Sequence, residues 1–195
     1  MQYYLKRAIL PWVYLVFMTI LSLSVHAVEN VVLKYVFMSA TLLLYLFILS
    51  LISYKDGQEA LKIRMSNDIE RRTIIETGED RPLNLQAEYK SYKGFLIGLV
   101  VSIPLIVLII VHSILIPSSD GVTTFAGKIA HVLYSMVFNF FRMGDAPLTV
   151  YTTYCTLVYV PVVMLSIGVS YILGAKSIEN QQEQIKHIHK QIYGE

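Results

Sequence analysis

The sequence has one cysteine, Cys155, one tryptophan, and no acidic or basic side chain deep inside its long apolar runs. A single cysteine excludes an intramolecular disulfide and any metal site built from several cysteines. Proton-coupled carriers and intramembrane enzymes usually need an ionisable group within the membrane. We therefore expect no cofactor, and a non-catalytic protein is favoured over an enzyme.

Short catalytic and nucleotide-binding motifs are also missing. The chain contains no G-x-x-x-x-G-K-[ST], H-E-x-x-H, G-x-S-x-G or G-x-G-x-x-G pattern. The formal net charge of +2 is too small to indicate a nucleic-acid partner.

Apolar residues make up 55% of the sequence and the mean hydropathy is +0.55. They gather in four runs, and each run is long enough to cross the ~30 Å hydrocarbon core as a helix. Inside lipid a helix satisfies its own backbone hydrogen bonds. We predict a single all-α integral membrane domain over residues 1–195, with its four transmembrane helices arranged as two hairpins. The expected crossings cover residues 8–28, 33–53, 94–116 and 148–173.

The first apolar run has a second interpretation. The basic start "MQYYLKR" and the small residues of "SVHA" resemble a cleavable signal peptide. The run is long for a signal peptide, however, and the next crossing begins almost immediately. We expect residues 1–27 to be retained as a crossing.

Basic residues are distributed unevenly between the connecting segments. With the N-terminus in the cytoplasm and four crossings, 13 of the 16 Lys and Arg residues fall on the cytoplasmic side. A fifth crossing would export the C-terminal lysines. We predict an integral protein of the plasma membrane with both termini in the cytoplasm.

Residues 126–142 are too few to cross comfortably. On a helix, one narrow polar stripe runs along an otherwise apolar surface. We interpret the segment as a short amphipathic helix in the outer interface, or as a re-entrant segment. The stripe either faces water or lines a shared cavity. The membrane-interface residues of this stripe are Lys128, His131, Ser135, Asn139 and Arg142.

The segment 54–93 is predicted to form a cytoplasmic helical loop. Asp56 and Glu59 have the spacing of a capping box, from which a helix would run toward Thr77. A second helical stretch, 83–92, would lead into the third crossing. Eight basic and eight acidic residues balance one another in the loop, which argues against a dedicated patch for anionic lipids.

The tail, residues 174–195, is polar and predicted to be helical. Its isoleucines follow a heptad pattern in which Gln181 replaces one apolar residue. The stripe is expected to pack on the loop helix, on a second copy or on another subunit. The candidate partner-binding residues of loop and tail are Leu61, Met65, Ile69, Ile178, Ile185, Ile188 and Ile192.

Two further features concern sites and packing. His112, His131 and Asp145 would lie near the outer leaflet and are weak candidates for a metal or proton-handling cluster. No metal is expected, because interfacial histidines more often serve packing. Gly94 and Gly98 form a G-x-x-x-G pattern that allows close approach of another helix.

These observations favour one function without establishing it. The leading hypothesis is a non-catalytic multi-pass membrane subunit or adaptor that binds a protein partner through its cytoplasmic loop and tail. The alternative is a small oligomeric transporter or channel for a neutral or lipid-like solute, since hydroxyl side chains occur within the crossings. A membrane-embedded enzyme with an outer His/Asp site is a third hypothesis. The expected partners are the lipid bilayer and another protein or a second copy.

Overall fold

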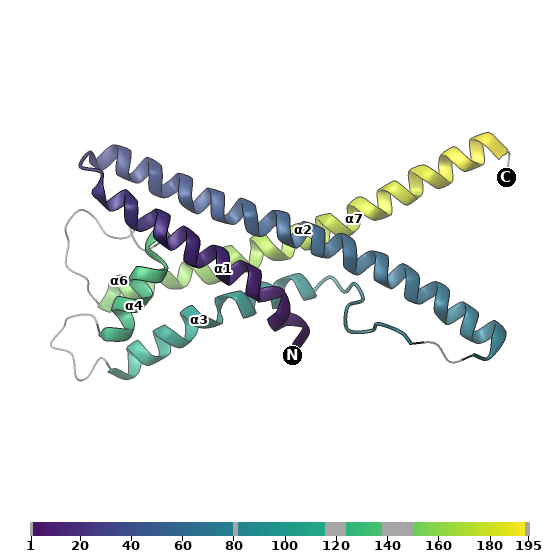
Figure 1. The fold of residues 1–195 in the computed structure, drawn as a ribbon, viewed down its shortest axis with the longest axis horizontal. Coiled ribbons are helices and arrows are strands. Elements are labelled where there is room, and N and C mark those ends of the chain that lie inside the picture. The colour runs from purple at the N-terminus through teal and green to yellow at the C-terminus, as the bar shows by residue number, and fades with distance from the viewer. Residues whose placement is uncertain (1, 80–81, 116–123, 138–149, 194–195) are drawn as a thin grey trace.

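The computed structural model describes residues 2–79, 82–115, 124–137 and 150–193. This part of the chain is helical with short connections and contains no strand (Figure 1). Four of its helices are long and apolar enough to cross a membrane. The prediction of an all-α fold with four helices long and apolar enough to cross a membrane is therefore confirmed for the described residues.

The first half of the chain forms two long helices. Helix α1 spans Gln2–Ser24 and leads through a short 3-10 turn, Val25–Ala27, to helix α2, Val31–Thr77. Asn30 caps α2 by accepting a hydrogen bond from the backbone N–H of Leu33. The helix ends at Gly78, whose φ of 73° is the left-handed conformation that glycine adopts readily.

Helix α2 contains 47 residues and is about 70 Å long, more than twice the hydrocarbon thickness. The expected loop helix toward Thr77 is the uninterrupted continuation of the second crossing. The expected capping box is wrong, because Asp56 and Glu59 lie inside α2.

The second half of the chain contains helices α3, Lys93–Leu115, α4, Phe125–Leu133, and α6, Val150–Cys155. A 3-10 turn at Thr156–Val158 connects α6 to α7, Tyr159–Tyr193. The tail is helical as predicted, since α7 runs from the fourth apolar run to Tyr193. Residues 82–92 contain turns and no helix, so the expected helical stretch 83–92 is wrong.

The expected helix over 126–142 is interrupted. Helix α4 ends at Leu133, and Tyr134 has φ −112° and ψ 28° before residues 135–137 are helical again. His131 and Ser135 are buried, so these two members of the polar stripe face protein and not water. Lys128 is exposed, while Asn139 and Arg142 lie outside the described residues.

Helices α2 and α7 cross near the middle of the molecule and share its most extensive interface (Figure 1). A Cβ atom at Gly57 would overlap the Tyr171 backbone, and one at Gly174 would overlap the Tyr54 backbone. The two helices therefore meet backbone to backbone, which only glycine permits at these positions. Within the apolar runs of the same two helices, the Ser50 and Ser166 hydroxyls hydrogen-bond at 2.9 Å.

Helix α3 packs on the other side of α7. A Cβ atom at Gly98 would lie 2.7 Å from the Met164 Cα, and Gly94 faces Tyr171. The G-x-x-x-G pattern thus marks a true helix contact. The pairing of the crossings into two hairpins stays a prediction, since α7 contacts both α2 and α3.

Candidate functional site at the polar end of the bundle

We use the name polar end for the part of the bundle formed by α2 beyond residue 53, by α7 beyond residue 173, and by the N-terminal end of α1 with residues 82–93. At the polar end, Arg7 of α1 bridges two carboxylates of α2. Its Nη1 contacts Asp56, and its Nη2 donates to Glu59 Oε2 at 2.8 Å. The two acidic residues are one turn apart on the same face, so one guanidinium reaches both.

Asp56 is the most unusual charge of this group, because it is buried. It lies three residues beyond Ser53, where the apolar run of α2 ends, and is therefore outside that run. Burial raises the pKa of the Asp56 carboxyl to about 6, and the adjacent Arg7 guanidinium opposes that rise. A buried carboxylate beside a single arginine makes the fold depend on that arginine.

A cavity of about 630 Å³ lies beside this ion-pair cluster. Its wall comes from the first turns of α1, from α2 between Ile52 and Ile63, and from the segment that leads into α3. Leu10 and Ile52 belong to the apolar runs, whereas Asn84 and Gln86 belong to that connecting segment. Apolar and polar side chains therefore both line the cavity.

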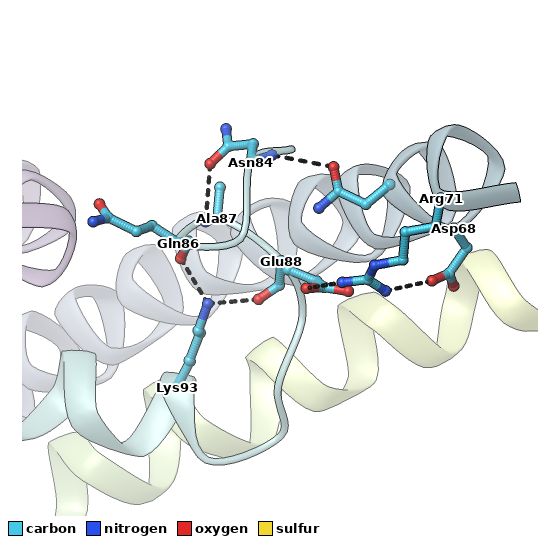
Figure 2. A network of polar contacts seen from close by, with 8 residues as sticks. Asp68, Arg71, Asn84, Gln86, Ala87, Glu88 and Lys93 are labelled. Carbon is cyan, nitrogen blue, oxygen red and sulfur yellow. Dashed lines mark hydrogen bonds and ion pairs between the residues drawn. The ribbon is translucent and has the colours of Figure 1, made fainter. Parts of the chain in front are cut away.

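The segment 82–92, which we call the return segment, is held against α2 by polar contacts (Figure 2). Asn67 accepts a hydrogen bond from the Asn84 N–H at 3.2 Å, and the Tyr89 N–H donates to the Ala60 carbonyl at 3.1 Å. Arg71 joins Glu88 at 3.1 Å and Asp68 at 2.8 Å. A segment of turns without helix hydrogen bonds is thereby fixed in place.

Lys93, the first residue of α3, anchors the other end of the return segment. Its buried ammonium donates to the carbonyl oxygens of Gln86 and Glu88, both at 2.6 Å (Figure 2). The same nitrogen lies 5.1 Å from the centre of the Tyr3 ring, a cation–π contact with α1. One side chain thus connects α1, α3 and the return segment.

Replacing Lys93 with methionine should release the return segment, because two carbonyl groups lose a charged donor. Each such bond is worth roughly 1.5–3 kcal/mol. We expect the amides of residues 84–90 to exchange hydrogen at least about tenfold faster, measured by hydrogen–deuterium exchange in detergent. Lys90→Met removes an exposed lysine of the same segment and should leave the exchange unchanged. Equal exchange in both variants would contradict the anchoring role.

The predicted partner-binding residues divide into two groups. Leu61 and Ile178 are buried against one another with Ala175, and Met65 packs on them. The Gln182 amide also reaches the Met65 sulfur at 3.0 Å. This contact joins α2 to the first turns of the tail, as expected for packing of the tail on the loop helix.

Beyond Gln182 the tail stripe does not pack on α2, so the first of the three expected packing arrangements is wrong for this part of the tail. Ile185, Ile188 and Ile192 are 65%, 53% and 66% exposed, and Ile69 on α2 is 65% exposed. Figure 1 shows the reason, since α2 and α7 diverge past their crossing and point away from each other. Every described tail side chain from 179 to 192 is exposed.

The weak metal candidates lie at the opposite end of the bundle. His112 Nδ1 is 2.7 Å from the Thr124 hydroxyl, and His131 Nε2 is 2.9 Å from the Thr153 hydroxyl. Both imidazoles are buried. The first bond connects α3 to Thr124, the N-cap of α4, and the second connects α4 to Thr153 of α6. In the part of the chain that the structure describes, no three His, Cys, Asp or Glu side chains form a metal-binding group. Asp145 lies outside that part.

Sequence reasoning missed the ion-pair cluster and the role of Lys93. Arg7 precedes Asp56 by 49 positions, and no local pattern predicts that separation. The usable signal is position, because Arg7, Asp56 and Lys93 all lie within about one turn of an end of an apolar run. A charged side chain so close to an apolar run favours an ion pair or hydrogen bond with another helix of the bundle.

Comparison of the chain with protein-family models, with curated proteins and with solved structures gave no match.

Proposed function

We propose that this chain is a non-catalytic multi-pass membrane subunit whose exposed tail recruits a helical protein partner. We further propose that its crossings form two hairpins in the plasma membrane, with both termini and the polar end in the cytoplasm. The positive-inside distribution of Lys and Arg supports this orientation.

One observation carries the proposal. The tail helix presents Ile185, Ile188 and Ile192 along a single side, and no described part of the chain covers them. The exposed part of the helix, residues 179–192, is short enough to be marginal as an isolated helix in water. Packing of an apolar stripe against another element normally stabilises such a helix. An exposed isoleucine stripe on a polar helix is therefore a surface for another helix.

The residues beside the stripe favour a second copy of the chain as the occupant. The flanking heptad positions hold Gln182, Gln184, His189 and Gln191, and none of them is Lys, Arg, Asp or Glu. Charged flanks would repel or select a partner, whereas neutral flanks allow two identical helices to pair. Two copies in one membrane would also present their tails in parallel and at the same height.

A photocrosslinking amino acid at position 188 tests this proposal in native membranes. We expect an adduct of twice the mass of the 22.2 kDa chain. The same probe at position 190, on the opposite side of the helix, should give little product. Asparagine at 185, 188 and 192 together should abolish association of tagged and untagged copies.

An adduct of another mass at position 188 would retain the docking surface but overturn the second copy as its occupant. No adduct at 188, or equal adducts at 188 and 190, would overturn the docking surface itself.

A further inference from the structure

The cavity at the polar end combines apolar and polar lining, as a site for an amphiphile requires. Leu10 and Ile52 belong to the apolar runs of α1 and α2, so that side of the cavity adjoins the lipid-facing surface. Asn84 and Gln86 of the return segment add polar lining, and Ile63 of α2 adds a further apolar side chain. Its volume of about 630 Å³ is within the range of small-molecule sites.

Charges of both signs line this cavity. Arg7 is shared by Asp56 and Glu59, so these three side chains together carry one negative charge when both carboxylates are ionised. Lys6 also lines the cavity, and it makes no ion pair with any described residue. A surplus carboxylate and a separate ammonium therefore face one space.

We propose that this cavity binds a phosphoethanolamine group, with its ammonium on Glu59 and Asp56 and its phosphate on Lys6. A primary ammonium donates up to three hydrogen bonds and suits two carboxylates one turn apart. The phosphate accepts from a lysine that has no competing ion pair. Leu10 and Ile52 would contact the acyl chains of a phospholipid. A soluble phosphoethanolamine compound shares the same headgroup chemistry. The proposal is independent of the function proposed for the tail.

Native mass spectrometry of the purified full chain in detergent tests the site directly. The probes are phosphatidylethanolamine, phosphatidylcholine and phosphatidylglycerol with identical acyl chains. We expect phosphatidylethanolamine to bind about tenfold more tightly than either of the others, since only it combines a hydrogen-bonding ammonium with a phosphate. Glycerophosphoethanolamine, added as a competitor, distinguishes a phospholipid ligand from a soluble one. If it displaces phosphatidylethanolamine only weakly, the acyl chains contribute and the ligand is the lipid. If it displaces phosphatidylethanolamine at equal concentration, the ligand is a soluble compound.

Variants connect the binding to these side chains. Lys6→Gln leaves the Arg7 contacts intact, and it should weaken phosphatidylethanolamine binding about tenfold. Glu59→Gln should do the same. The matched controls Lys62→Gln and Glu76→Gln make the same chemical changes at exposed positions of α2 that do not line the cavity. Equal binding of the three lipids, or unchanged binding in both cavity variants, would overturn the proposal and leave the cluster as an ion pair of the fold.

Discussion

Replacing Gly57 with leucine should prevent helices α2 and α7 from crossing as they do. A Cβ atom at this position already overlaps the Tyr171 backbone, and a leucine side chain adds three more carbons. Backbone cannot rotate out of the way as a flexible side chain does, so one helix must move as a whole. We expect a loss of at least about 3 kcal/mol, at the upper end of the usual cost of overpacking.

The reciprocal variant Gly174→Leu meets the Tyr54 backbone and should behave in the same way. Lys62→Leu adds the same side chain at an exposed position of α2 and serves as the matched control. Thermal unfolding in mild detergent, followed by size-exclusion chromatography, measures the effect. A Gly57→Leu protein that melts within a few degrees of the unaltered chain would contradict the crossing.

Replacing Arg7 with methionine should destabilise the fold strongly at pH 7.5, because it leaves the buried Asp56 carboxylate without its cation. Removing one partner of a buried pair typically costs about 3 kcal/mol or more. The sign of the pH dependence follows from burial, which raises the pKa of Asp56 to about 6 in the folded chain. The ionised carboxylate opposes folding, so stability should recover as the pH falls through about 6.

In the Arg7→Met variant the opposing effect of the guanidinium is gone, so the pKa of Asp56 rises further and recovery begins at a higher pH. The double variant Arg7→Met, Asp56→Asn should regain much of the stability and lose this pH dependence. Thermal unfolding at pH 5.5 and 7.5 compares all three proteins. Equal destabilisation of Arg7→Met at both pH values, with no rescue by Asp56→Asn, would show that Arg7 does not compensate the buried Asp56 carboxylate.

The helices themselves could be predicted from the sequence, since apolar runs of about 20 residues leave few alternatives. Helix α3, Lys93–Leu115, begins one residue before the expected third crossing, 94–116, and continues to the last described residue of that run. The length of α2 was harder to predict. The apolar run ends at Ser53, but the chain has no helix-breaking residue before Gly78, and the isolated Gly57 serves packing.

The polar end could not be predicted in the same way, because its contacts join distant segments. Asp56 and Glu59 have the spacing of a capping box, but in the structure they lie inside α2 and pair with Arg7. The tail was predicted only in part, since heptad spacing identifies a stripe but not what covers it. Ile178 and Ile185 share a heptad position, yet the first is buried against Leu61 of α2 and the second is exposed.

Labelling of the tail tests most directly whether α7 leaves the bilayer on the cytoplasmic side. A cysteine at position 190, which is exposed and lies opposite the isoleucine stripe, is treated with a membrane-impermeant maleimide in intact cells and after permeabilisation, with the unaltered chain and its Cys155 as background. We expect labelling at position 190 only after the membrane is opened. Labelling at that position in intact cells would contradict the orientation proposed for the tail.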